Sequence, residues 1–199
     1  MTERLAAGNR AAVPGTVAGV DRLSTTLEQV RARTPLDAAE EASITGFVHH
    51  VERLVAAGAD PFDERDDPVH ITGSSIVIGP RGTVLLEHRR LGMWLQPGGH
   101  VDPGENPWDA ARREAAEETG LDVVFHDGRI ELVHVDVHAG GRGHTHLDLR
   151  YLLDGGADDP DPPEGESQAV AWFDWSAAPE RAGDDRLARL LRSLGRRFA

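Results

Sequence analysis

Residues 99–121 read GHVDPGENPWDAARREAAEETGL, and the second half of this stretch has the spacing of an amphipathic helix. Asn106 suits an N-cap and Pro107 suits the first helical position, while Gly120 suits the residue just beyond the last turn. One face is apolar and consists of Trp108, Ala111 and Ala115. Since residues three and four apart share a helix face, we expect these side chains to meet a core. The stretch therefore predicts a helix that follows a glycine-rich loop and ends before Gly120.

Three glutamates, Glu114, Glu117 and Glu118, crowd the neighbouring face of this helix. Like charges at this spacing destabilise an isolated helix, so a compensating positive charge is expected. Carboxylate oxygens are ligands that Mg²⁺ and Mn²⁺ prefer, and glycines allow backbone to approach such a ligand closely. Arg113 precedes Glu117 by four residues and can hold its carboxylate in place. The pattern predicts a divalent-metal site, and the alternative is a solvated helix face.

The stretch also matches the pattern G-x5-E-x7-R-E-U-x-E-E-x-G-U at every position, where U is an aliphatic residue. The matching residues are Gly99, Glu105, Arg113, Glu114, Ala115, Glu117, Glu118, Gly120 and Leu121. At roughly one in ten per fixed residue, seven fixed matches arise by chance on the order of once in ten million starting points. This pattern is the Nudix box, so the chain resembles a Nudix hydrolase. The resemblance extends from about Asp60 to Ser176 and favours a bacterial subgroup with an N-terminal helical extension.

The resemblance implies a set of site residues around the box. The implied ligands of Mg²⁺ or Mn²⁺ are the Gly99 carbonyl and the carboxylates of Glu114, Glu117 and Glu118. Glu114 is then the predicted base that activates water, with Glu105 and Arg113 supporting the helix. In some members of the family the base lies in a later loop, and Glu164 and Glu166 occupy a comparable place here. Our candidate catalytic residues are therefore Glu105, Arg113, Glu114 and Glu166.

Outside the box, changes of hydrophobic period predict the remaining elements. We expect a loose tail over 1–20, helical structure over 24–57 interrupted near 34–35, strands at 70–78 and 83–88, a loop over 89–107, strands at 121–125, 130–138, 144–153 and 170–175, and a helix over 184–198. Strands and helices mix without strict alternation, which favours an α+β fold. The resemblance implies a Nudix-type α/β/α sandwich with a mixed β-sheet. We assign 1–65 to the tail and helical extension and 66–199 to the Nudix domain.

The predicted hairpin over 131–151 has polar residues at alternating positions. One strand carries His134, Asp136 and His138 on one face, and the next carries His144, His146 and Asp148. Alternate residues of a strand point to the same face, so the two sets can converge. We predict that His144 and His146 bind substrate or form part of a second metal site. The alternative is an exposed polar face of the sheet.

Arg89 and Arg90 stand just before the glycine-rich loop and are predicted to bind substrate phosphates, since the guanidinium group offers a bidentate fork. The alternative for both is an ordinary surface charge. We interpret the arginines of the terminal helix as a solvated face. The N-terminal helices are expected either to cap the substrate pocket or to form a homodimer interface.

Composition excludes several classes of function. The net charge of −13 argues against a general DNA or RNA binder and requires that an anionic ligand be met by metal ions or by a local basic patch. The chain has no cysteine, which excludes disulfides, thiolate ligands and a cysteine nucleophile. No apolar run is long enough for a signal peptide or a membrane span, so we expect a cytoplasmic protein without a membrane partner.

Together these features predict a metal-dependent hydrolase that cleaves the pyrophosphate bond of a nucleoside diphosphate linked to another moiety. A nucleotide sugar, ADP-ribose, a dinucleotide polyphosphate and an oxidised nucleoside triphosphate are all candidate small-molecule substrates. One alternative is an enzyme like isopentenyl diphosphate isomerase, although that chemistry relies on a cysteine that is absent here. Another is a non-catalytic Nudix module for ligand sensing, although such modules commonly lose box carboxylates and this chain keeps them all.

Overall fold

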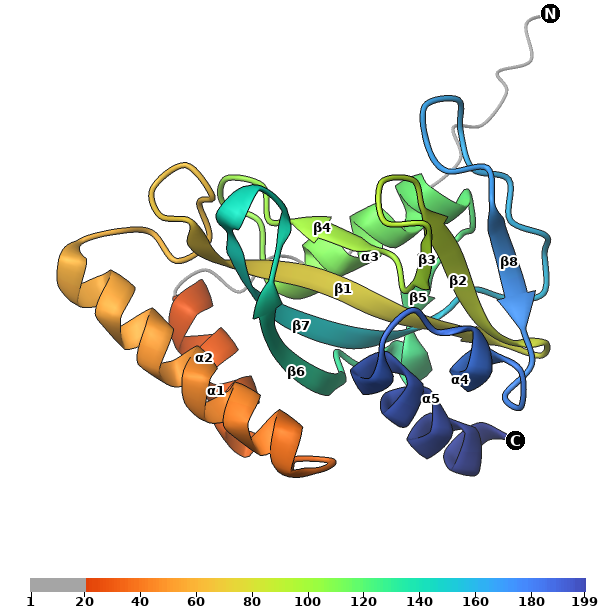
Figure 1. Ribbon diagram of the computed structural model, residues 1–199, viewed down its shortest axis with the longest axis horizontal. Coiled ribbons are helices and arrows are strands. Elements are labelled where there is room, and N and C mark those ends of the chain that lie inside the picture. Colours follow the sequence, from red (N-terminus) through yellow and green to blue (C-terminus); the bar gives the residue numbers. More distant parts are fainter. Residues whose placement is uncertain (1–20) are drawn as a thin grey trace, which may run out of the picture.

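A mixed eight-stranded β-sheet forms the centre of the structure, a computed structural model that describes residues 21–199 (Figure 1). The strands are β1 (Val69–Gly79), β2 (Gly82–His88), β3 (Met93–Leu95), β4 (Gly98–His100), β5 (Val124–Phe125), β6 (Leu132–Ala139), β7 (Thr145–Asp154) and β8 (Val170–Phe173). The helices are α1 (Arg22–Ala32), α2 (Ala38–Ala57), α3 (Pro107–Thr119), α4 (Ala178–Arg181) and α5 (Asp185–Phe198). The predicted loose tail over 1–20 lies outside the described residues.

The strand order is β3-β2-β1-β7-β5, with β4 paired to β1, β6 to β7 and β8 to β2. Strands β1 and β7 run parallel over their whole length, whereas the other pairs are antiparallel. Helices cover both faces, which confirms the predicted α+β sandwich with a mixed sheet. On one face Ile71 and Leu147 pack with α1, α2 and α3, and on the other Ile76 and Leu152 pack with α4 and α5.

The helix of the Nudix-like stretch is confirmed as α3. Gly120 adopts a left-handed conformation (φ 70°) at its C-terminal end, as predicted. Asn106 occupies the N-cap position, but its side chain donates a hydrogen bond to Asp109 (2.9 Å) instead of capping a backbone N–H. The start of α3 lies directly on β1, because a Cβ atom at Gly73 would stand only 2.2 Å from the carbonyl oxygen of Pro107.

Three expectations need correction, two about secondary structure and one about the arginines of the terminal helix. The loop predicted over 89–107 contains the short strands β3 and β4, which pair with β2 and β1. The strand predicted over 121–125 is limited to Val124–Phe125. The arginines of α5 are also not simply a solvated face, since Arg186 contacts Asp136 (2.6 Å) and Arg189 contacts Asp37 (2.6 Å).

The N-terminal helices lie beside β6 at one side of the sheet (Figure 1). In α2, the Glu40 carboxylate and the Ser43 hydroxyl accept hydrogen bonds from the backbone N–H groups of Val135 (3.1 Å) and Val137 (3.2 Å). These N–H groups belong to a strand that pairs only with β7, so α2 satisfies the other side of β6. Within residues 21–199, no helix combines the length and the apolar composition that a bilayer crossing requires.

Candidate active site

One face of the sheet changes from apolar to polar towards the start of β1, and there it forms three rows of polar side chains. The register places His70, His146 and His138 in one row across β1, β7 and β6; Thr72, Asp148 and Asp136 in the next; and Ser74, Arg150 and His134 in the third. A cavity of about 820 Å³ lies over these rows. Its other walls are β4, the turn between β6 and β7, Glu118 of α3 and the start of α5.

Of the box glutamates, Glu118 lines one side of this cavity, together with Gly98 and Gly99. The Gly98 N–H donates to Oε2 of Glu118 (2.9 Å), so the loop before α3 is tied to the last turn of the helix. A Cβ atom at Gly99 would lie 2.5 Å from the carboxyl carbon of Glu114, and only glycine permits this approach. Burial raises the pKa of Glu118 to about 7 and also raises the pKa of Glu114. Glu117 is more exposed, with 55% of its side chain accessible.

Arg113 connects the box glutamates to one another. Its guanidinium group donates to both carboxylate oxygens of Glu105 (3.1 and 3.0 Å), to Glu114 (2.8 Å) and to Glu117 (3.2 Å). It also donates to the carbonyl oxygen of His100 (3.0 Å), which fixes the β4 loop against α3. The hydrogen bonds with Glu105 are the main reason that the pKa of Arg113 lies above its usual value. Arg113 therefore connects Glu105, Glu114 and Glu117 with the β4 loop.

The donor set fits a hard divalent cation. Glu114 and Glu118 bring two half-buried carboxyl groups beside the backbone of Gly98 and Gly99. Burial disfavours the ionised form of both groups, and for Glu114 it outweighs the opposite effect of Arg113, which explains why both pKa values are raised. A cation bound by these oxygens would reverse this preference, and Mg²⁺ takes few carboxylates together with substrate oxygens.

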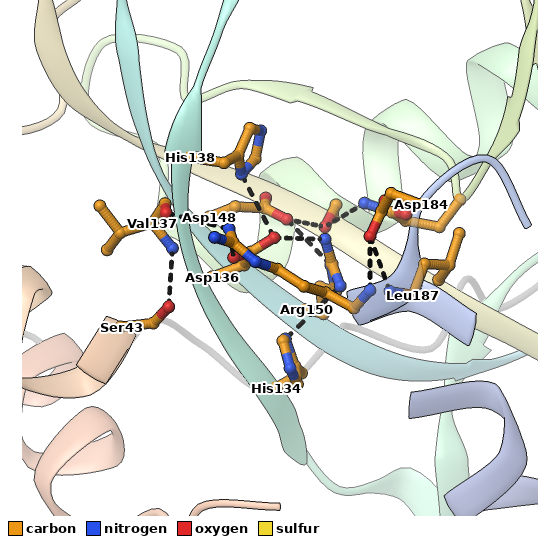
Figure 2. Close-up of polar contacts among 12 residues, drawn as sticks. Ser43, His134, Asp136, Val137, His138, Asp148, Arg150, Asp184 and Leu187 are labelled. Carbon is orange, nitrogen blue, oxygen red and sulfur yellow. Dashed lines mark hydrogen bonds and ion pairs between the residues drawn. The ribbon is translucent and has the colours of Figure 1, made fainter. Parts of the chain in front are cut away.

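The opposite wall is a buried ionic network (Figure 2). The Arg150 guanidinium donates to Asp136 (3.0 Å) and Asp148 (3.2 Å), and Asp148 also accepts from the hydroxyls of Thr72 (3.0 Å) and Ser74 (2.8 Å). Asp136, Asp148 and Arg150 are each at most 3% exposed. The alternative of an exposed polar face is therefore wrong for Asp136 and Asp148, whose carboxylates are held in ion pairs within the structure.

Protonation within this wall is set by burial and by ion pairs. Burial alone would raise the pKa of Asp136, but His138, Arg150 and Arg186 bring it well below its usual range. Burial lowers the pKa of His134 and of His146 to about 3 each. Near neutral pH, Asp136 is therefore ionised while His134 and His146 are neutral.

The other predicted site residues lie in different places. His144, His146 and Arg90 line the cavity. Arg89 instead donates to the carbonyl oxygens of Gly165 and Glu166, so it holds the late loop rather than facing the cavity. The negative charge of Glu166, the alternative base, is one of the causes of the raised pKa of Glu118. Glu166 therefore lies near the box. Glu164 is exposed.

Several residues of the cavity were missed by the sequence analysis. Arg150 shares a strand face with Asp148, two residues earlier, and this alternation was an available signal. Arg142 lines the cavity from the glycine-rich turn, where it adopts a left-handed conformation (φ 59°). His70 and Arg186 had no local signal, because distant strand pairing and the packing of α5 bring them to the site.

Comparisons with known proteins agree with this arrangement. A family model described as NUDIX domain matches residues 69–194. The isopentenyl-diphosphate Delta-isomerase of Corynebacterium glutamicum (strain R) is 36% identical over 66 residues, which are 30% of this chain and 35% of the relative. The RNA pyrophosphohydrolase of Rhodopseudomonas palustris is 38% identical over 74 residues, which are 33% of this chain and 42% of the relative. The chain thus spans less than half of the length of these two relatives.

Among solved structures, a NUDIX-family hydrolase from Clostridium perfringens is similar with a TM-score of 0.55 and 23% identity, covering 63% of this chain and 97% of that one. An Ap4A hydrolase from C. elegans is similar with a TM-score of 0.53 and 23% identity, covering 64% of this chain and 96% of that one. These structural similarities establish a common fold.

Proposed function

The chain belongs to the Nudix family, whose model covers 126 of its 199 residues (69–194), and we propose on this basis that it is a metal-dependent pyrophosphohydrolase. The proposed reaction cleaves the pyrophosphate bond of a nucleoside diphosphate linked to another moiety. The observation that carries the proposal is the pair of half-buried carboxyls, Glu114 and Glu118, packed against Gly98 and Gly99, with Glu118 lining a large cavity. The cavity, at about 820 Å³, has the size of a small-molecule site.

Glu114, Glu117, Glu118 and the Gly99 carbonyl would hold Mg²⁺ or Mn²⁺ in this proposal. When bound, such a metal neutralises charge on phosphate oxygens and makes a water molecule more acidic. Arg113 and Glu105 position the carboxylate of Glu114 through the hydrogen bonds described above.

The remaining proposed roles concern the proton and the substrate. Glu114 is the proposed base that takes a proton from the attacking water, and Glu166 is the alternative from the late loop. Arg90 would donate to substrate phosphates from the rim of the cavity, while His144 and His146 would contact the rest of the substrate. Arg89 was predicted to bind phosphate as well, and its contacts with the late loop favour a supporting role instead.

The proposed substrate is a small nucleotide rather than a nucleic-acid polymer, given the net charge of −13. A cytoplasmic location and a homodimer formed through the N-terminal helices remain predictions. The other expected role of these helices, a cap on the substrate pocket, is not supported, because no residue of 21–57 lines the cavity.

The test is a screen for release of nucleoside monophosphate, followed by anion-exchange chromatography, in the presence of Mg²⁺ or Mn²⁺. The panel contains nucleotide sugars, ADP-ribose, dinucleotide polyphosphates and oxidised nucleoside triphosphates. We compare the wild type with Glu118→Gln, and use Glu52→Gln on the exposed surface of α2 as the matched control. Metal-dependent turnover that is lost only in Glu118→Gln supports the proposal. Tight nucleotide binding without turnover in any sample would favour a sensing module and overturn it.

A diphosphate isomerase is the second candidate, because the Corynebacterium glutamicum relative named above carries that function in its name. The absence of cysteine argues against it, as described for the sequence. The screen therefore includes isopentenyl diphosphate, with product analysis by NMR. Isomerisation without release of phosphate would identify this activity.

A further inference from the structure

His70 is a buried histidine that the proposed hydrolysis does not use. The residue is 0% exposed, and neither ring nitrogen has a hydrogen-bond partner among residues 21–199. A buried polar atom without a partner is costly, and an isolated one in a native structure calls for an explanation such as a bound ion. The ring is surrounded by other imidazoles, with centroids 5.0 Å away for His100 and 5.2 Å away for both His144 and His146.

The arrangement of these imidazoles is compatible with metal coordination. His70, His100 and His146 each offer one ligand atom, and the three atoms lie within 4.8 Å of one another. In a tetrahedral zinc site with bonds of about 2.1 Å, nitrogen ligands are about 3.4 Å apart, so only small side-chain rotations separate this cluster from a closed site. His70 lies on β1, His100 on β4 and His146 on β7. Both β4 and β7 pair with β1, so the three residues have a rigid support.

We propose that His70, His100 and His146 bind a divalent transition-metal ion at a site separate from the box carboxylates. Imidazole nitrogens suit zinc and related ions, whereas the oxygens of Glu114 and Glu118 suit magnesium or manganese. The two sites therefore differ in ligand chemistry, and each selects a different class of ion.

Neighbouring residues strengthen the assignment. The Glu64 carboxylate lies 3.2 Å from Nε2 of His100, and carboxylates in this position commonly orient metal-binding imidazoles. Glu64 also forms a second group of possible ligands with His70 and His144, so donors surround His70 on more than one side.

The proposed ion would have access to the same cavity as the box. His100, His144 and His146 all line the cavity, whereas His70 lies behind them. Three protein ligands leave a coordination position for water or for an oxygen of a bound ligand, as in zinc sites with an open position. The site would then add a second anchor for a phosphate or carboxylate group in the same cavity.

The test measures metal binding directly. Full-length protein is treated with a chelator, and Zn²⁺ is then titrated in competition with a chromophoric chelator, with and without saturating Mg²⁺. We expect one tight equivalent that Mg²⁺ does not displace. His100→Ala and His146→Ala should each weaken binding by about 100-fold or more, since loss of even an orienting residue costs about 10- to 100-fold.

Two controls separate this site from others. His49→Ala removes an exposed histidine from α2, and Glu118→Gln alters the box; both should keep the tight equivalent. Circular dichroism verifies that each variant is folded. The visible spectrum of the Co²⁺-loaded wild type gives a measurement that needs no variant, because imidazole ligands in a low-coordinate site give intense bands.

Unchanged affinity in His100→Ala and His146→Ala would overturn the proposal, as would a Co²⁺ spectrum of six oxygen ligands. Loss of the tight equivalent in Glu118→Gln would overturn it too, because the ion would then be at the box. These measurements do not use turnover, so their failure leaves the proposed hydrolase activity untouched.

Discussion

Replacement of Glu40 by alanine should detach the N-terminal helices from the sheet. The Glu40 side chain is fully buried, and its carboxylate accepts four hydrogen bonds. Two come from Arg33 (2.9 and 3.3 Å), one from the Leu36 N–H (2.5 Å) and one from the Val135 N–H (3.1 Å). One side chain thus connects the α1–α2 linker with strand β6.

The magnitude follows from the partners that lose their acceptor. A donor left unsatisfied in a buried place costs about 1–3 kcal/mol, and breaking a buried ion pair by removing one partner costs about 3–5 kcal/mol. These costs overlap, so we expect Glu40→Ala to lower the free energy of unfolding by about 3–5 kcal/mol in total. Against a typical stability of about 5–15 kcal/mol, this is a large fraction. With a urea m-value of about 2 kcal/mol per molar, the midpoint should fall by about 2 M.

The assay is urea unfolding followed by far-ultraviolet circular dichroism. Glu52→Ala is the control, because Glu52 lies exposed on the same helix and its ion pair with Arg31 (3.5 Å) is worth less than about 1 kcal/mol. Surface substitutions usually change the free energy of unfolding by less than about 1 kcal/mol. If Glu40→Ala also changed it by less than about 1 kcal/mol, the reasoning would be refuted.

Three further outcomes are expected. Gly73→Ala should destabilise the fold by about 1–3 kcal/mol in thermal unfolding, because its Cβ would meet the Pro107 carbonyl at 2.2 Å; an unchanged midpoint would contradict this. Arg113→Lys should lower kcat about 10- to 100-fold, with little change in KM, on a substrate found by the screen. The reason is that a lysine ammonium group cannot bind the carboxylates of Glu105 and Glu114 with the planar geometry of a guanidinium group. An unchanged kcat would exclude a positioning role. Burial lowers the pKa of His134 to about 3 in the folded state, so below pH 6.5 the unfolded chain binds more protons than the folded protein. The stability that is present above pH 6.5 is therefore lost as the pH falls towards 3. The expected loss from His134 is about 2 kcal/mol at pH 5, measured by urea unfolding at pH 7.5 and 5.0, and His134→Asn should reduce this difference.

The α3 helix and its glutamates could be predicted because every signal for them is local. The cap positions, the small residues that face the core and the spacing of Glu114, Glu117 and Glu118 all lie within one short stretch. The same holds for the hairpin of β1 and β2, whose turn contains Gly79 and Gly82. Strands β3 and β4 have only three residues each and no clear period, so their pairing with longer strands was not visible.

The polar wall could be predicted only in part. Alternation showed correctly that Asp136 and His138 share a face, and that Asp148 can approach them across the hairpin. Alternating polar residues usually indicate a solvent-exposed face, however, and the local sequence does not show that Arg150 and Arg186 pair with these carboxylates. Burial of Arg150 depends on the parallel pairing of β1 and β7, whose starts are 76 residues apart in sequence (Val69 and Thr145).

The net charge of the chain is strongly negative, but several arginines line the cavity. A net charge of −13 repels a phosphate ligand unless cations meet it locally. Arg150 and Arg186 form ion pairs with Asp136 in the wall of the cavity, so their positive charges are already neutralised within the protein. Arg90 and Arg142 also line the cavity, and neither has an ion-pair partner among residues 21–199. Arg150 and Arg186 therefore hold the wall together, whereas under the proposed function Arg90 and Arg142 are the arginines of the cavity that would meet an anionic substrate.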